Sequence, residues 1–524
     1  MKTIKYILGT LVIAASLSAC VKDLDVIPID PNANTADKAL VDEAAFQSLL
    51  AGVYTGYACP GYYGKDGSPS LSGLDGGASQ YIRGLYNLNE LTTDESMISW
   101  NDQTIKNFHW MNWTTDDSFI YSFYSRIFLQ VSFANEFIRE AKASSVEFAK
   151  KNEYIAEARV LRALAYYHAI DNFGNVPFAD ETSIVGQNPD QITRAKLYEW
   201  LEKELTDLID GNDLAAPRAN GYARADKGVA KFLLAKLYLN AEVYTGTAQW
   251  QKCADVLKDL MDDGYSLHTT SKGNYSAYQE LFLADNDKCT DEIIFAVEQD
   301  GVNTTSYGAT NYIIFGSTIG DNPTMNPDEI GITSGWSGIH MTPEFYDKFS
   351  KDDARYLFHT DGQSRDVIDL MAADGLNLQG YAFKKFLNRT SEGGFGKEKG
   401  SVDTDFPMMR YADVLLMAAE CQARGASIDG LGAYNQVRTR AGMPTVSTLS
   451  LSEIIDERAR ELYQECWRRS DLIRFGLFTS GDYLWQWKGN VFEGRAVDAG
   501  RSLFPIPDSD LLANTKLQQN EYYK

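Results

Sequence analysis

Apolar residues recur at helical spacing over long parts of the chain. The clearest case is residues 153–170, EYIAEARVLRALAYYHAI, where Glu153, Glu157 and Arg162 lie opposite an apolar stripe. This spacing is that of an amphipathic helix with one buried face. The Gly and Pro residues of FGNVPF, residues 173–178, predict where the helix ends. The apolar stripe consists of Ile155, Ala158, Leu161, Ala165 and Ala169.

Six further segments continue the helical pattern. Residues 225–244 and 250–265 are separated only by TGTAQ, and they carry small Ala residues where two antiparallel helices would cross. A helix pair of this size is typical of a tetratricopeptide unit, whose period is about 34 residues. We therefore predict a mainly α fold built on tetratricopeptide-like helix pairs. The other segments are 192–209, 406–425, 433–442 and 451–476.

Two long regions, about 54–115 and 266–405, interrupt the helical pattern. The second contains the short strand-like runs EIIFAVEQ, residues 292–299, and NYIIFGS, residues 311–317. Loops this long within a compact chain are uncommon and often carry function. We expect residues 41–524 to form a single domain, in which a helical scaffold carries the ligand site on two loop-rich insertions.

The first 19 residues, 1–19, have the form of an export signal. Lys2 and Lys5 precede an apolar stretch that is shorter than the roughly 20 residues of a membrane-spanning helix. LSAC, residues 17–20, resembles a bacterial lipoprotein cleavage site, at which Cys20 would carry the lipid. The alternative is an ordinary secretory signal that happens to contain a cysteine. We expect residues 20–40 to be a lipidated, flexible lead.

The chain is strongly acidic. It has 49 Lys and Arg against 72 Asp and Glu, a formal net charge of −23. Such a surface repels phosphate backbones, which argues against nucleic acid as a partner. The 30 Tyr and 9 Trp suit a surface that binds a ligand with an apolar face. The five cysteines after Cys20 show no CxxC spacing, so they predict neither a disulfide framework nor a zinc site.

Known catalytic motifs are missing from the sequence. There is no HExxH, GxSxG, Walker-type loop or Rossmann glycine run, and the five His residues are scattered singly. Paired carboxylates are frequent in so acidic a chain and do not by themselves indicate a glycosidase. We therefore predict a protein that is not an enzyme and that requires no cofactor.

Two acidic segments suggest calcium. Asp403 and Asp405, in DTD, and the acids of DNDKCTDE, residues 285–292, offer the oxygen ligands that Ca²⁺ prefers. DNDKCTDE lacks the Gly of a helix-flanked calcium loop. The alternative is that these aspartates form turns and helix caps. Calcium at Asp403 and Asp405 is thus an expectation that stands beside a purely structural one.

The order of several motifs resembles one known family, the SusD/RagB outer-membrane nutrient-binding lipoproteins. The resemblance implies an α-helical fold on four tetratricopeptide units, no catalysis, and a lipid anchor on the outer membrane, facing the cell exterior. It also implies a lid-like association with a TonB-dependent transporter of the SusC type, alongside other surface glycan-binding lipoproteins. The motifs are LSAC at Cys20, EARVLRALAYYHAIDNFGNVPF, FPMMRYADVLLMAAE, VRTRAG, ERARELYQECWRRSDLIRFG and LFPIPDSDLLANTKLQQNEYY.

The resemblance extends to the starch-binding prototype of the family, in which an arc of aromatic rings cups the curved face of an α-glucan. It implies that Trp100, Tyr312 and Trp336 supply the rings here, with Arg83 as a hydrogen-bond donor. All three rings lie in the two loop-rich insertions. The resemblance therefore points to the same regions as the breaks in the helical pattern.

The chain departs from this prototype at two positions. Ile98 stands where the prototype has a further Trp, and Gln103 stands where it has a binding Asn, with Asn101 nearby. Asn101 and Gln103 are therefore expected to contact the ligand. Either departure is expected to shift affinity or chain-length preference.

We expect the protein to bind starch-like α-glucan or maltooligosaccharides. The apolar face of a pyranose stacks on an indole or phenol ring, while its hydroxyls need polar partners. Each of three rings would contribute about 1 kcal/mol by burial, so the affinity should lie in the millimolar to micromolar range. The open alternatives are a differently linked α-glucan, a surface glycoside hydrolase, and a scaffold that caps the transporter and binds no sugar.

Overall fold

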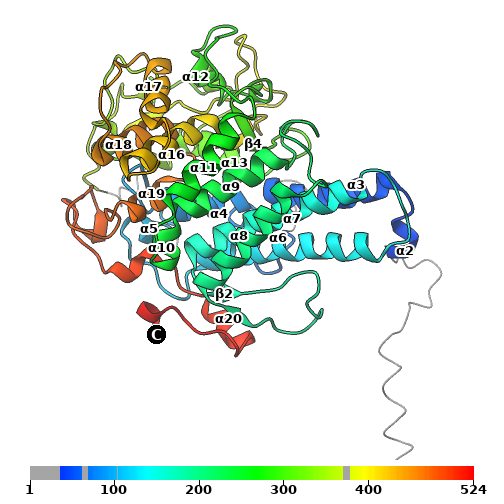
Figure 1. Cartoon of the computed structure of the whole chain (residues 1–524). Coiled ribbons are helices and arrows are strands. Elements are labelled where there is room, and N and C mark those ends of the chain that lie inside the picture. Colours follow the sequence, from blue (N-terminus) through cyan, green and yellow to red (C-terminus); the bar gives the residue numbers. More distant parts are fainter. Residues whose placement is uncertain (1–35, 62–68, 103, 321, 370–377) are drawn as a thin grey trace, which may run out of the picture.

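The computed structural model describes residues 36–61, 69–102, 104–320, 322–369 and 378–524. Within them the chain is mainly helical with a few short strands, as Figure 1 shows. The predicted mainly α class is thus confirmed. The predicted export signal, Cys20 and Gln103 lie outside the described residues, as does most of the predicted lead.

The helices of the first half of the chain pack side by side (Figure 1). Their bounds are α2 (Ala36–Ala39), α3 (Glu43–Ala58), α4 (Tyr81–Asn89), α5 (Lys106–His109), α6 (Ser118–Ala143), α7 (Lys151–Asn172), α8 (Arg194–Asp210), α9 (Lys227–Leu239), α10 (Ala241–Thr245) and α11 (Trp250–Met261). α6 contacts α3, α4 and α7, and the series continues from α7 to α8, α9 and α11. This series agrees with the predicted helix pairs, while their tetratricopeptide detail stays a prediction.

Local sequence explains where the long helices begin. α6 begins after Asp117, whose carboxylate accepts hydrogen bonds from the backbone N–H groups of Phe119 and Ile120 at 2.9 and 3.2 Å. α9 begins after Asp226, which accepts one from Val229 at 3.1 Å. Such caps satisfy backbone donors that a helix start leaves unpaired. The helix predicted over 153–170 is confirmed as part of α7.

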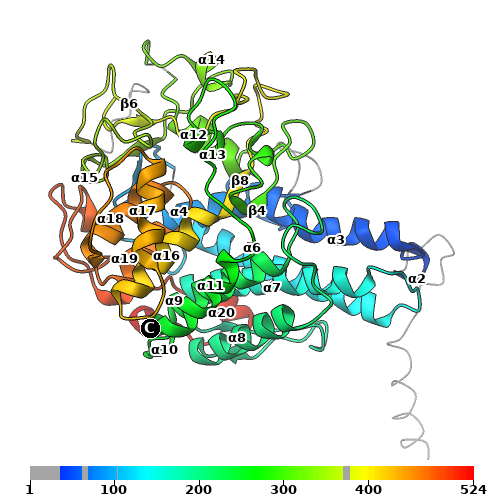
Figure 2. The ribbon, with the colours of Figure 1, turned by 45° about the horizontal axis from the view of Figure 1, so that its top comes forward.

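The C-terminal helices continue the scaffold, whereas the loop-rich insertion carries only short helices. The bounds are α12 (Ala277–Glu280), α13 (Ala309–Ser317), α14 (Pro327–Ile330), α15 (Pro343–Tyr346), α16 (Tyr411–Ala423), α17 (Gly430–Arg440), α18 (Leu451–Leu462), α19 (Arg468–Arg474) and α20 (Asp508–Ala513). α16 contacts α11, α17 and α18. Figure 2 shows α12 to α15 gathered at one end of the molecule, above α7, α8, α9 and α11.

The strands of the described residues form four two-stranded antiparallel sheets. The strand predicted within 292–299 is confirmed as one of them. The β1–β5 sheet joins the two loop-rich insertions. The pairs are β1 (Ser96–Ile98) with β5 (Ile339–Met341), β2 (Val176–Pro177) with β3 (Gln191–Ile192), β4 (Ile293–Val297) with β8 (Phe406–Arg410) and β6 (Phe358–His359) with β7 (Ala382–Phe383).

Two predicted elements are of the wrong type. The strand-like run 311–317 lies in α13, whose residues are all buried. A wholly buried helix and a buried strand cannot be distinguished by apolar periodicity. The helix predicted over 406–425 begins only at Tyr411, because residues 406–410 form β8. Pro407 disfavours the helical conformation at Phe406, which instead pairs with Val297 of β4.

One continuous apolar core underlies both the scaffold and the loop-rich insertions. It includes residues of α7, α9 and α16 together with residues of α4 and α13. The insertions are therefore packed onto the scaffold, which can hold their side chains in place. Among the described residues, no helix combines the length and the apolar character needed to cross a membrane.

Candidate functional site

The β1–β5 sheet brings the two predicted indoles together. The strands pair with Ile98 opposite Ile339. The pairing continues beyond them, because the backbone N–H of Ser99 donates to the carbonyl of Gly338 at 2.8 Å. Trp100 therefore lies beside Trp336, although 236 positions separate them in the chain.

Trp100 and Trp336 form one curved surface with Tyr307. The ring centroids are 6.3 Å apart for the two indoles and 6.0 Å apart for Tyr307 and Trp336, with planes inclined at 50° and 56°. Both indoles are half-buried and Tyr307 is 38% exposed. These rings line an open hollow of about 660 Å³, which we call the aromatic depression. It is lined by Asp75, Arg83, Trp100, Asn101, Asp102, Tyr307 and Trp336.

Hydrogen bonds hold both indoles in place. The indole N–H of Trp100 donates to the backbone carbonyl of Trp336 at 2.9 Å. The backbone N–H of Trp336 donates to the carbonyl of Phe315 at 2.7 Å, and the ring of Phe315 lies 4.8 Å from that of Trp336. Because the rings are held before a ligand arrives, binding need not order them.

Tyr312 does not line the aromatic depression, and this part of the predicted site is corrected. Its ring is fully buried on α13, and its hydroxyl donates to Oδ1 of Asn87 at 2.8 Å. Burial raises the pKa of this hydroxyl above its ordinary value. The Tyr312 ring centroid lies 5.9 Å from that of Trp100. Tyr312 therefore supports Trp100 from within, and Tyr307 supplies the third exposed ring.

Arg83, on α4, lies at the edge of the aromatic depression. Its guanidinium carbon is 4.4 Å from the ring centroid of Tyr312 and 5.9 Å from that of Trp100. Its Nη1 donates to the backbone carbonyl of Tyr307 at 3.3 Å. A guanidinium held over aromatic rings keeps further N–H groups with which it can donate to sugar hydroxyls.

The rim of the aromatic depression is polar. Asn101 and Asp102 are exposed there, and Oδ1 of Asn101 accepts a hydrogen bond from the ammonium of Lys106 at 2.5 Å. Asp75 and Asp102 were not predicted, and their carboxylates can accept hydrogen bonds from hydroxyl groups. Gln103, the other predicted contact, lies outside the described residues.

Gln80 positions two sides of the aromatic depression and was not predicted from the sequence. Its buried Oε1 accepts hydrogen bonds from the backbone N–H groups of Arg83 at 2.9 Å and Ala309 at 2.8 Å. Its Nε2 donates to the carbonyl of Tyr57 at 2.7 Å. Gln80 thus joins the start of α4 to the start of α13, next to Tyr307. Its one signal in the sequence is a polar side chain directly before an apolar helix.

Two glycines permit the close approach of the rings. A Cβ atom at Gly338 would lie 2.2 Å from Cε2 of Trp100, and one at Gly77 would lie 2.5 Å from Cβ of Tyr307. Both distances are far shorter than a van der Waals contact. Any other residue at these positions would displace a ring of the aromatic depression.

Asp403 and Asp405 bind parts of the chain through all four carboxylate oxygens. Asp403 accepts hydrogen bonds from the backbone N–H groups of Gly301 and Lys397. Asp405 accepts one from the backbone N–H of Gln299 at 2.6 Å and one from the hydroxyl of Tyr222 at 2.9 Å. Both carboxylates thus have a structural role, and the described residues contain no group of three or more His, Cys, Asp or Glu spaced to hold a metal. Calcium binding by these residues stays a prediction.

Comparison with known proteins finds matches along nearly the whole chain. Residues 371–523 match the SusD family, and residues 75–239 match a family described as starch-binding and associating with the outer membrane. The starch-binding protein SusD of Bacteroides thetaiotaomicron is 32% identical, over 98% of this chain and 97% of that protein. SusD-like protein P2 of Formosa agariphila is 24% identical, over 77% of this chain and 81% of that protein.

Solved structures share the fold. Surface glycan-binding protein A of Bacteroides thetaiotaomicron, in complex with laminarihexaose, aligns with a TM-score of 0.69 at 18% identity, over 92% of this chain and all of that one. A laminarin-binding SusD-like protein aligns with a TM-score of 0.68 at 21% identity, over 92% of this chain and all of that one. The starch-binding relative and these two proteins are described as binding proteins and not as enzymes.

Proposed function

Because this chain belongs to the SusD family, we propose that it binds a starch-like α-glucan in the aromatic depression and does not cleave it. The observation that carries the proposal is the pair of half-buried indoles, Trp100 and Trp336, held 6.3 Å apart beside the guanidinium of Arg83. Rings offer a stacking surface for pyranose faces, and the guanidinium offers donors for their hydroxyls.

The curvature of the aromatic depression favours a coiled polymer. Successive ring planes are inclined at 50° and 56°, so the three rings cannot all stack on one flat chain. An α-1,4-linked glucan turns along its length and can present successive sugar faces to inclined rings. A starch-like glucan is also what the 32% identical relative is named for binding.

The expected affinity is weak. If each ring removes roughly 50 Å² of apolar ligand surface from water, burial contributes about 1 kcal/mol per ring before ordering costs. Because Gln80 and the hydrogen bonds of the two indoles order the site in advance, those costs fall mainly on the ligand. The dissociation constant should therefore be millimolar to micromolar, which suits a protein that captures a glycan and then releases it.

Substitution of each indole tests the proposed site. Trp100→Ala and Trp336→Ala are each expected to weaken maltoheptaose binding at least tenfold by calorimetry, because each removes one stacking surface. The thermal midpoint should fall by no more than a few degrees, since both rings are only half-buried. Trp250→Ala, which removes a half-buried indole from α11, is the matched control and should bind normally. Normal binding by both depression variants would refute the assignment.

A second candidate function is the binding of a differently linked glucan by the same residues. It is favoured by the two solved structures of similar fold that are named for laminarin or laminarihexaose. Affinity electrophoresis in gels containing amylopectin, dextran or laminarin separates the candidates. Retardation by amylopectin alone supports the starch-like ligand, and retardation by dextran or laminarin alone assigns the other linkage. A reducing-sugar assay on the same polysaccharides tests for cleavage, and none is expected.

We also propose that a lipid on Cys20 anchors the protein on the exterior of the outer membrane, where it passes glucan to a SusC-like TonB-dependent transporter. Support comes from the LSAC sequence and from the matched family described as associating with the outer membrane. Anchoring would raise the effective concentration of the binder at the transporter. Cys20→Ala is expected to move the protein from the membrane fraction to the soluble fraction of cells. Retention in the membrane fraction would contradict the lipid anchor.

A further inference from the structure

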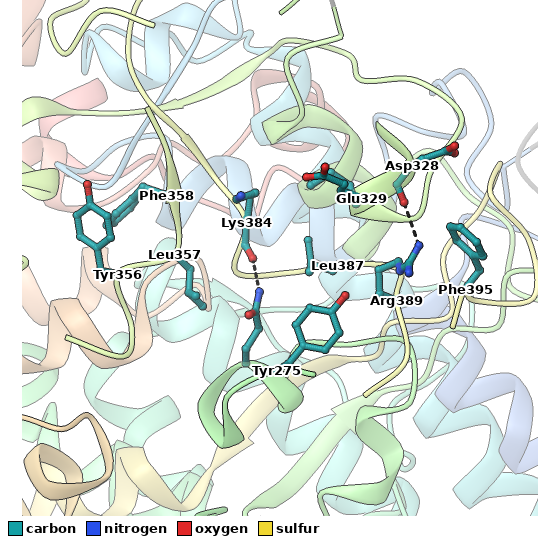
Figure 3. Close-up of a pocket in the computed structure, with 12 residues that line it drawn as sticks. Tyr275, Asp328, Glu329, Tyr356, Leu357, Phe358, Lys384, Leu387, Arg389 and Phe395 are labelled. Carbon is teal, nitrogen blue, oxygen red and sulfur yellow. Dashed lines mark hydrogen bonds between the residues drawn. The ribbon is translucent and has the colours of Figure 1, made fainter. Parts of the chain in front are cut away.

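A second cavity lies in the loop-rich part of the molecule and shares no lining residue with the aromatic depression. Its volume is about 590 Å³, a size typical of pockets that hold small molecules. Its lining residues lie in or next to α12, α14, β6 and the segment 384–395, and Figure 3 shows their side chains. These segments are distant in sequence, so only the fold assembles the cavity. We call it the loop cavity.

Aromatic rings bound the loop cavity. In Figure 3 Tyr275 lies near the centre, with Tyr356 and Phe358 at one end and Phe395 at the other. The guanidinium carbon of Arg389 lies 4.0 Å from the ring centroid of Phe395, so a cation already covers that ring. The half-buried ring of Tyr275, by contrast, meets no other aromatic ring and no cation in the described part of the chain. Tyr275 packs against the apolar core, and part of its side chain lines the loop cavity.

Polar groups without partners surround this ring. Within the described residues, the hydroxyl of Tyr275, the ammonium of Lys384 and the carboxylate of Glu329 make no hydrogen bond or ion pair. Nε of Arg389 is buried and also has no partner there. The carboxylate of Asp328, by comparison, pairs with Lys399 at 2.8 Å. The loop cavity thus offers both donors and acceptors that the protein itself leaves unused.

The loop cavity carries both positive and negative side chains, and this limits the kind of ligand it can bind. An anion would be attracted by Lys384 and Arg389 but repelled by Glu329, and a cation would meet the reverse. A purely apolar molecule would cover the half-buried side chain of Lys384 without giving its ammonium a partner. A neutral molecule with many hydroxyls can accept from Lys384 and donate to Glu329 at once. If it also has an apolar face, it can stack on Tyr275.

The geometry points to a second saccharide site: the loop cavity binds one or two sugar residues, with a pyranose face on Tyr275 and hydroxyls on Lys384 and Glu329. This site rests on its own residues and not on those of the aromatic depression. One long glycan that reaches both sites is held with an avidity that short oligosaccharides do not reach. The loop cavity would then favour polymer over fragments.

Saturation-transfer NMR on the complete lipid-free chain tests the second site. The probes are maltotriose, laminaritriose and xylotriose, and the protein is the Trp100→Ala/Trp336→Ala double variant, which removes the indoles of the aromatic depression. At least one trisaccharide is expected to receive saturation from this variant. Adding Lys384→Met or Tyr275→Ala should reduce that signal at least threefold, and Lys351→Met, an exposed lysine outside the cavity, should leave it unchanged.

Two outcomes would overturn the second site. One is that none of the three trisaccharides receives saturation from the double variant. The other is that the signal persists unchanged when Lys384→Met and Tyr275→Ala are added, each verified as folded by its thermal midpoint. Lys384→Met keeps the ring of Tyr275 and removes only a charge, so it guards against loss of folding in the tyrosine variant. The proposed function of the aromatic depression is tested separately. It fails if the original chain and the Trp100→Ala/Trp336→Ala variant bind maltoheptaose equally well.

Discussion

At the scale of single residues, exposure decides which aromatic side chain can meet a ligand. Tyr307 and Tyr312 lie five positions apart, yet one is 38% exposed and the other fully buried. The hydroxyl of Tyr312 donates a hydrogen bond to Oδ1 of Asn87, and its ring packs beneath Trp100. Tyr307 precedes α13 and stays at the surface beside Trp336. The two tyrosines therefore have different structural roles, one at the surface of the aromatic depression and one in support beneath it.

Substitution of the two tyrosines separates these roles. Tyr307→Ala is expected to weaken maltoheptaose binding about three- to tenfold with little change in stability, because it removes an exposed ring. Tyr312→Phe should leave binding within about twofold but lower the free energy of unfolding by about 1 kcal/mol or more, because Oδ1 of Asn87 loses its donor. Calorimetry and urea unfolding measure the two effects. The reverse pattern would place Tyr312 in the ligand site.

At the scale of elements, the segment between α4 and β1 anchors the strand that carries Trp100. Its Glu90 and Glu95 are buried and accept hydrogen bonds from the backbone N–H groups of Cys466 and Gln464. Cys466 and Gln464 have positive φ angles, of 67° and 64°, a conformation that costs residues other than glycine about 1 kcal/mol or more. The two carboxylates thus stabilise the turn between α18 and α19 and tie it to β1.

This carboxylate pair predicts a pH dependence of stability. Burial raises the pKa of Glu95 to about 7, and burial together with Glu95 raises that of Glu90. The folded state therefore holds a proton that the unfolded state releases near pH 4.5, so this contribution to stability falls as the pH rises from about 4.5 to 7. Glu95→Gln keeps an oxygen acceptor for Gln464 and does not titrate.

As the pH rises from 5 to 8, the free energy of unfolding of Glu95→Gln should therefore increase by about 1 to 3 kcal/mol relative to that of the original chain. Urea unfolding of both proteins at the two pH values measures the change. If the two proteins differ in unfolding free energy by the same amount at both pH values, Glu95 titrates alike in the folded and unfolded states.

At the scale of the whole molecule, buried ion pairs join the loop-rich insertion to the C-terminal helices. Arg410, at the end of β8, pairs with Glu292 at 2.5 Å, Glu461 at 3.0 Å and Glu465 at 2.7 Å, and all four side chains are at most 1% exposed. Glu461 of α18 also pairs with Arg355 at 3.3 Å. α18 is thereby connected to both β4–β8 and the segment before β6. Such a network holds the insertion on its scaffold.

Loss of one member of this network should be costly. Arg410→Met is expected to lower the free energy of unfolding by about 3 to 5 kcal/mol, because each of three buried carboxylates loses one of its cationic partners. The matched control is Arg365→Met, whose arginine is 41% exposed and pairs with Asp347 and Asp366 at the surface. That change should cost less than about 1 kcal/mol. Equal losses in urea unfolding would argue against the buried network as the link.

Much of the scaffold could be predicted because helices are specified by neighbouring residues. The apolar stripe of 153–170 and the break at FGNVPF located α7 to within two residues at each end. The segments that became α13 and β8 could not be assigned, because their burial and pairing partners come from distant parts of the chain. For the site, the resemblance located Trp100, Trp336 and Arg83 but had no signal for Gln80.

The sequence by itself determined the helical class, the family and the loop-rich insertions, because periodicity, turn residues and motif order are all local and need no partner. Only the tertiary structure decided that β1 and β5 set Trp100 beside Trp336, that Tyr307 and not Tyr312 is exposed, and that a second cavity forms around Tyr275. The physical reason is that exposure and proximity depend on which distant segments pack together. Packing depends on the whole chain at once.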